Sequence, residues 1–352
     1  MGPVSEVLRA PFVAVAGGDR VERYRAGLIP CLLLLAALGA ALAFDAGRRG
    51  RGWWFQILVA VGLVVNPITL AAVHLGHPEE IVAAALLSGS VLMARRRRVV
   101  GSGVAAGLAV ATKAWALAGI PVVFFALAGT RARRTFAIAA IVAALPIGLI
   151  AAGAPARFRG NLHEFGRLGA APGTVSVTNV WWPVADAVPF DAPLGFDAAG
   201  RLVTRPASGY QLSKPVARLA HGAVLLAGLL VALAWRRRPA GPDTVLLALA
   251  LALLIRCVLD PGTVSYYHTP FLVALVAYEA GARRRLPWLS LIVVATFELL
   301  TRVFAPAQDR AIFNAAYLVW ALGLVGVIAT ELWVWPASRR APLGPDGRRA
   351  GS

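Results

Sequence analysis

The sequence contains very little lysine, cysteine or acidic charge. Its 352 residues include 17 aspartates and glutamates against 35 lysines and arginines, and the only lysines are Lys113 and Lys214. Cys31 and Cys257 lie within or beside apolar runs, so neither a disulfide framework nor a metal site is predicted. The net charge of +18 does not indicate nucleic-acid binding, because the arginines lie in short loops between apolar runs rather than along one solvated face.

Apolar residues are abundant and make up 59% of the chain, whereas soluble domains contain about half. Backbone polar groups in lipid need internal partners, so each long apolar run predicts a membrane-spanning helix. We expect an all-α polytopic transmembrane bundle of about eleven spans. These spans are predicted at residues 27–44, 53–75, 81–94, 99–112, 114–129, 135–152, 216–235, 243–259, 269–282, 287–303 and 311–335.

The arginines indicate how the spans are oriented. Translocation of clustered cations is disfavoured, so the loops that carry them stay in the cytoplasm. The short loops 76–80 and 260–268 contain no arginine or lysine, and they are predicted to be extracytoplasmic. The arginine clusters follow every second span, at 48–51, 95–98, 131–134, 236–238, 283–285 and 339–340.

Five parts of the chain follow from this orientation. They are an outer interfacial segment at 1–26, N-terminal transmembrane helices at 27–152, an extracytoplasmic loop or cap at 153–215, C-terminal transmembrane helices at 216–335 and a disordered cytoplasmic tail at 336–352.

The orientation places residues 1–26 outside, although no span precedes them. Residues 4–16 are too short to cross a bilayer. We therefore expect them to form a helix at the outer interface, following an upstream span that the sequence as given lacks.

The outer turn at 76–80 contains the first candidate site. Its His77, Glu79 and Glu80 precede an apolar helix, so the acids either cap that helix or bind substrate. Lys113 lies at the outer end of a helical pair. An ammonium at membrane depth is costly without a partner, which favours a functional role over a lysine that only extends to the headgroups.

A second group of candidates follows the run at 243–259. Arg256 lies about one helical turn before Asp260, and the pair either neutralises itself or serves a site. Arg256, His268 and Lys113 would together supply cationic donors for a phosphate. Tyr267 is expected in an interfacial aromatic belt, with binding as the alternative.

The order of these elements resembles the GT-C superfamily of membrane glycosyltransferases, particularly glycosyltransferase family 87, the polyprenyl-phosphate-mannose-dependent mannosyltransferases. The resemblance covers about residues 4–300 and extends to the dolichyl-phosphate-glucose-dependent enzymes over Lys113 to Pro121 and at Tyr267-His268. The matching elements are Asn66-Pro67, Gly76-His77, the following arginine cluster, and Gly107-Leu108-Ala109 leading to Lys113 and Pro121.

The resemblance implies a bacterial plasma-membrane hexosyltransferase whose active face is extracytoplasmic. It would move a hexose, mannose above all, with inversion and without metal or cofactor, from a polyprenyl-phosphate-sugar in the bilayer to a glycolipid or glycan acceptor. The family's catalytic aspartate belongs to a first outer loop that this sequence lacks, so Glu79 or Glu80 is the candidate base. The acceptor or sugar pocket is predicted to contain His77, Glu79, Glu80, Asn66, Asp260, Tyr267, Trp181 and Trp182.

Two other functions remain open. A transporter or lipid flippase would place polar residues near the midplane and break helices in both halves, whereas the polar residues here gather at one face. An inactive, shortened membrane scaffold would use the outer loops only to bind a partner.

Overall fold

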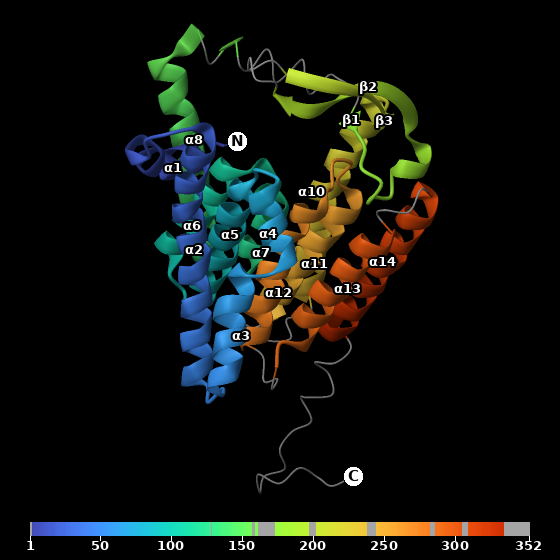
Figure 1. Cartoon of the computed structure of the whole chain (residues 1–352). Coiled ribbons are helices and arrows are strands. Elements are labelled where there is room, and N and C mark those ends of the chain that lie inside the picture. Colours follow the sequence, from blue (N-terminus) through green and yellow to red (C-terminus); the bar gives the residue numbers. More distant parts are fainter. Residues whose placement is uncertain are drawn as a thin grey trace, which may run out of the picture.

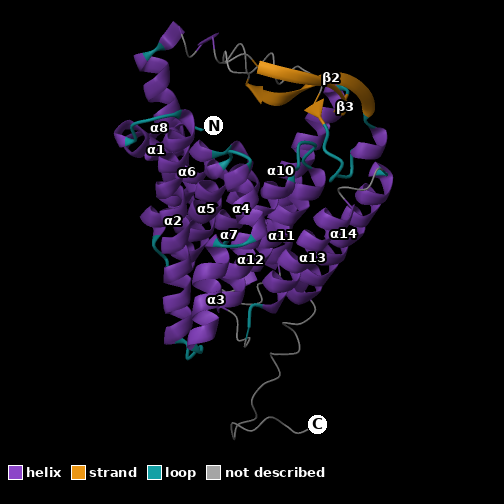
Figure 2. Cartoon of the chain, in the orientation of Figure 1, coloured by secondary structure: helices purple, strands orange, loops and turns teal. Residues whose placement is uncertain are grey.

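The computed structural model describes residues 2–127, 129–156, 159–160, 173–196, 202–237, 244–281, 286–304 and 309–333. These residues form a helical bundle with a small sheet over one end (Figures 1 and 2). The helices are α1 (Pro3–Val15), α2 (Arg20–Arg48), α3 (Trp53–Val64), α4 (Pro67–His74), α5 (Pro78–Arg95), α6 (Val99–Thr112), η1 (Ala114–Gly119), α7 (Ile120–Phe125), α8 (Gly129–Gly153), η2 (Trp182–Val184), α10 (Lys214–Arg237), α11 (Thr244–Leu259), η3 (Ser265–His268), α12 (Thr269–Gly281), α13 (Trp288–Phe304) and α14 (Arg310–Trp333).

Each apolar run that predicts a span is helical in the structure. By length and composition, however, only five helices of the described chain could each cross a membrane. They are Arg20–Arg48, Trp53–His74, Gly129–Gly153, Lys214–Arg237 and Arg310–Trp333. The structure therefore supports a helical membrane protein without confirming the predicted number of spans.

The hydrophobic core lies where α5, α11 and α12 pack together. Nearly every residue of α11 and every residue of α12 is buried. By contrast, only 6% of the most apolar window of α8 is buried within the protein. Such a helix needs an apolar solvent on its outer faces, as a bilayer provides.

Two of the expected spans are broken by polar residues. The run at 53–75 is divided into α3 and α4 at Asn66, whose side chain caps α4 while Pro67 occupies its first turn. The run at 114–129 forms the short η1 and α7, because Lys113 ends α6 in an extended conformation.

The outer interfacial segment differs in its boundary from the prediction. Its helix, α1, is present, but α2 already begins at Arg20 with Asp19 as its N-cap. The first long helix is therefore longer at both ends than the predicted run 27–44. The predicted tail at 336–352 lies outside the described residues.

The bundle is all-α as predicted, and the long loop adds a small sheet that the sequence did not predict. Strands β1 (Gly173–Thr174), β2 (Asp186–Phe196) and β3 (Leu202–Leu212) are antiparallel in the order β1-β3-β2. Their pairing runs from Asp186 with Gln211 to Phe196 with Leu202. Strand β2 contains prolines, which are tolerated there because β2 is an edge strand.

The arginine clusters meet at one end of the bundle. Asp45 pairs with Arg49 at 2.9 Å and with Arg96 at 3.2 Å, which joins the clusters at 48–51 and 95–98. Arg49 also donates to the carbonyl of Gly281, next to the cluster at 283–285. Arg97 and Arg131 line a common cavity and add the cluster at 131–134. In Figure 1 the α2–α3 turn lies at this end, while α1 and the sheet lie at the other.

Candidate functional site

The candidate site lies at the end of the bundle away from the arginine clusters. Three segments meet there: the α4–α5 turn, the link between α6 and η1, and the segment from the end of α11 to η3. The turn is tight because Gly76 has φ of +81°, a conformation that favours glycine. Gly76 and His77 donate their N–H groups to the carbonyls of Val73 and Ala72, which closes α4 and points His77 and Glu79 into the site.

Two buried carboxylates share one ammonium at this site. Lys113 Nζ lies 3.0 Å from Glu79 Oε1 and 3.2 Å from Glu80 Oε1. Both glutamate side chains are only 1% exposed, whereas Lys113 is 21% exposed. Burial lowers the pKa of Lys113, but the carboxylates of Glu80 and Glu79 more than offset it and leave the pKa raised. Lys113 is therefore a cation at neutral pH.

The two carboxylates differ in their other partners. Glu79 Oε1 also lies 3.0 Å from His77 Nδ1, and the His77 ring stacks on Tyr266 with centroids 4.4 Å apart. Within the described part of the chain, Lys113 is the partner of Glu80, and neither Glu80 oxygen has a further one. Glu79 Oε1 contacts both His77 and Lys113, whereas Glu80 contacts Lys113 and can still accept a proton or a hydrogen bond.

Arg256 lies beside this cluster, between two aromatic rings. Its guanidinium carbon is 4.6 Å from the ring centre of Trp115 and 4.5 Å from that of Tyr267. It donates to the carbonyl of Tyr267, and its Nε is 3.7 Å from Asp260 Oδ2. The predicted Arg256–Asp260 pair is present, and cation–π contacts offset much of the cost of burying the charge.

The sequence did not identify Trp115 as part of the site. It follows Lys113 by two residues, and the extended backbone at Lys113 directs the two side chains to neighbouring groups. The only sequence signal was a tryptophan beside an isolated lysine.

His268 is placed differently from the cationic role predicted for it. It is fully buried against Phe297 and Trp320, and its ring nitrogens contact the Ser265 carbonyl and the Tyr317 hydroxyl at 3.0 Å each. Burial lowers its pKa to about 4, so the ring is neutral at neutral pH. It contributes no charge for a phosphate.

Asn66 and the two loop tryptophans have structural partners. The Asn66 amide donates to the carbonyls of Gly62 and Leu63 and holds α3 to α4. Trp181 Nε1 donates to the Leu259 carbonyl at 2.6 Å, which fastens the long loop to the end of α11. Trp182 packs edge-to-face on Tyr210 of β3. The structure thus places the loop at Trp181 beside the end of α11 that carries the Arg256–Asp260 pair.

The site's chemistry follows from its charges. Glu79, Glu80 and Lys113 together carry an excess negative charge, which suits proton acceptance better than anion binding. Among the described residues no three histidine, cysteine or acidic side chains come together as metal ligands would.

Comparison with known families identifies the family of the chain. The family model of glycosyltransferase family 87 matches residues 3–261, which include the α4–α5 turn, Lys113 and the Arg256–Asp260 pair. No curated protein and no solved structure matches the chain. Since the family model covers well over half of the sequence, the chain is a member of glycosyltransferase family 87, the membrane glycosyltransferases that the sequence resembles.

Proposed function

We propose that this glycosyltransferase moves a hexose, mannose first among the candidates, from a polyprenyl-phosphate-sugar to a glycolipid or glycan acceptor on the extracytoplasmic side. The observation that carries the proposal is the pair of buried carboxylates on Lys113, at the bundle end opposite the arginine clusters at 48–51, 95–98 and 131–134. A family of sugar-transferring enzymes needs a base for the acceptor hydroxyl, and this is the candidate that the described site offers.

Glu80 is the proposed base. The acceptor oxygen forms a bond to the anomeric carbon while that carbon's bond to the phosphate oxygen breaks. The acceptor's proton passes to the Glu80 carboxylate, and the bonding electron pair leaves with the phosphate, which inverts the anomeric centre. Lys113 holds this carboxylate in place, and burial excludes water that would compete with the acceptor.

The role predicted for Lys113 at the donor phosphate is not part of this proposal. A phosphate brought next to Lys113 would also meet Glu79 and Glu80 within about 4 Å of the same ammonium, where like charges repel. Arg256 lies between the rings of Trp115 and Tyr267 and already contacts the Tyr267 carbonyl and Asp260, so we assign it to positioning Tyr267 and Asp260.

The test is sugar transfer by the full chain in proteoliposomes, with labelled polyprenyl-phosphate-mannose as donor and a membrane glycolipid extract as acceptor. Glu80→Gln keeps the shape of the side chain and removes the base, so transfer should fall by about 100-fold or more. Glu22→Gln, which changes an exposed carboxylate on α2, is the matched control and should keep wild-type activity. Undiminished transfer by Glu80→Gln would refute the base, and a wild-type chain that uses no polyprenyl-phosphate-sugar would refute the donor.

A further inference from the structure

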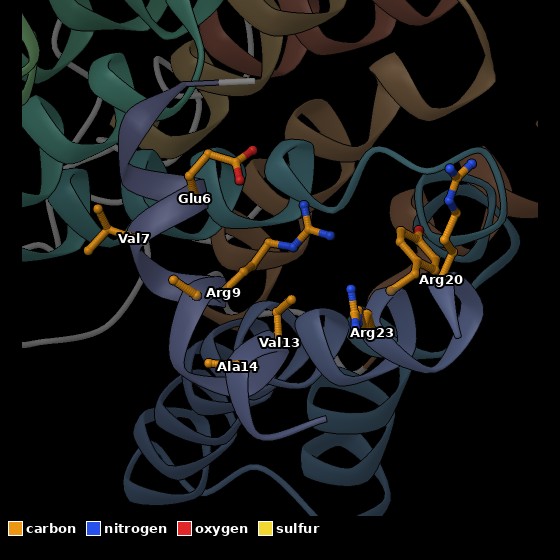
Figure 3. A pocket seen from close by; sticks show the side chains of 9 residues that line it. Glu6, Val7, Arg9, Val13, Ala14, Arg20 and Arg23 are labelled. Carbon is orange, nitrogen blue, oxygen red and sulfur yellow. The ribbon is translucent and has the colours of Figure 1, made fainter. Parts of the chain in front are cut away.

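A large cavity lies between α1 and the start of α2, and the predicted site residues do not line it. Its volume is about 700 Å³, and its walls combine apolar residues with three arginines and one acid. Figure 3 shows Arg9 reaching into this space from α1 and Arg23 from α2, with Arg20 on the far side and Glu6 above. Guanidinium groups that line one cavity are the donors that a phosphate binds.

The packing of α1 on α2 reserves room for one of these guanidinium groups. Arg9 is buried, lies 5.9 Å from the ring centre of Tyr24, and passes over Gly27 of α2. A Cβ at Gly27 would come within 3.0 Å of Arg9 Nε and 3.2 Å of its Nη2. The glycine therefore lets a cation lie beneath the cavity rather than in solvent.

The cavity adjoins the carboxylate cluster through Tyr24. Tyr24 lines the cavity, and its hydroxyl donates to the carbonyl of Val73, just before the turn that carries Glu79. At the other end of α1, Gly2 packs against the carbonyls of Ala111 and Thr112, next to Lys113.

The surroundings of the cavity are apolar as well as basic. Val7 and Val15 of α1 are 72% and 85% exposed, and Val13 lines the cavity beside Arg9. Arg9 of α1 and Arg20 and Arg23 of α2, beside exposed valines of α1, suit the interface between headgroups and lipid chains. The ligand that matches both features has a phosphate joined to a hydrocarbon chain.

We infer that the cavity between α1 and α2 binds the phosphate group of a membrane lipid through Arg9, Arg20 and Arg23. Resting on the proposed function, this lipid is the polyprenyl phosphate of the sugar donor. Its phosphate lies among the arginines, and its sugar reaches past Tyr24 toward Glu80. The arrangement keeps the leaving phosphate's negative charge apart from the carboxylates and meets it with cations.

The test measures binding instead of transfer, so it does not depend on the acceptor or on Glu80. The full chain in maltoside micelles is titrated with a polyprenyl phosphate, with the matching polyprenol and with inorganic phosphate. Arg20→Gln/Arg23→Gln should weaken binding of the polyprenyl phosphate by about tenfold or more, because charge-assisted hydrogen bonds are lost. Arg25→Gln, an exposed arginine of α2 outside the cavity, should leave it within about twofold of wild type.

Equal binding by the double variant and the wild type would overturn the cavity assignment. Equal binding of the polyprenol would show that the phosphate is not recognised, and full competition by inorganic phosphate would show a free-anion site instead of a lipid site. A chain that binds the polyprenyl phosphate through these arginines yet transfers no sugar would refute only the proposed function.

Discussion

At the scale of single residues, the cluster of Lys113, Glu79 and Glu80 affects both the stability of the fold and the proposed sugar transfer. Glu79 and Glu80 are buried carboxylates whose cation is Lys113. Removing that cation leaves two buried charges in repulsion, so a loss of activity in Lys113→Met alone would not separate misfolding from a lost chemical role. Neutral variants of all three residues separate the two.

We predict that Lys113→Met lowers the free energy of unfolding by about 3 kcal/mol, because a buried ion pair loses one partner. The triple variant Lys113→Met/Glu79→Gln/Glu80→Gln should regain most of this stability, since no uncompensated charge remains. Sugar transfer should stay absent in both. Thermal unfolding in detergent and the transfer assay measure the two effects separately, and a triple variant with normal transfer would exclude the cluster from the chemistry.

The aromatic pair around Arg256 makes a second residue-scale prediction. Trp115→Leu removes one of two cation–π contacts and should cost about 2 kcal/mol of stability. Trp115→Phe should lose less, because a ring face remains. Trp53→Leu is the control at an exposed position, and its unfolding temperature should stay near wild type. Equal losses in Trp115→Leu and Trp115→Phe would show that packing volume, and not the ring face, supports Arg256.

At the scale of elements, close helix packing depends on glycines spaced four apart. A Cβ at Gly103 or Gly107 would lie 2.8 Å or 2.5 Å from a backbone carbonyl of α8, so the glycines let α6 and α8 approach closely. Gly107→Ala should destabilise the chain by about 1–3 kcal/mol despite the better helix propensity of alanine.

Gly148→Ala is the matched control on α8, where an added Cβ meets nothing within 4 Å. Thermal unfolding should show a clear loss for Gly107→Ala and no loss for Gly148→Ala. Equal stability of both variants would mean that α6 and α8 are farther apart than the structure places them.

Hydrophobic runs predicted which segments are helical and, for two helices, the bounds as well. The expected helices at 99–112 and 243–259 agree with α6 and α11 within a residue. The same signal failed where packing decides the outcome: Asn66 breaks a single apolar run, and β2 forms despite its prolines because only β3 pairs with it. Asn66 is one polar residue within a long apolar run, and β2 depends on pairing with another segment of the chain. A hydropathy pattern read along the sequence shows neither effect.

The candidate site was partly predictable. The sequence signal was a polar residue isolated at the end of an apolar run. It identified Lys113, Glu79, Glu80 and Arg256, which lie close together in the structure. The sequence did not show that Lys113 would be neutralised by two acids, because contacts between α5 and the end of α6 depend on the fold. Nor did it show that His268 would be enclosed by aromatic rings from α13 and α14.

At the scale of the whole molecule, sidedness connects the fold to the function. Asp45 holds two arginine clusters together at one end, while the carboxylate cluster and the basic cavity lie at the other. If arginines mark the cytoplasmic face, a lipid-linked sugar reaches Glu80 only from the opposite side of the membrane. This orientation is the central claim of the proposed function.

Thiol labelling in intact cells tests the orientation most directly. Cys31 and Cys257 are buried and should not react. His74→Cys places an exposed thiol beside the α4–α5 turn, and Arg98→Cys places one in the arginine cluster between α5 and α6. A membrane-impermeant maleimide should label position 74 in intact cells and position 98 only after permeabilisation; labelling of both positions from the same side would contradict the account.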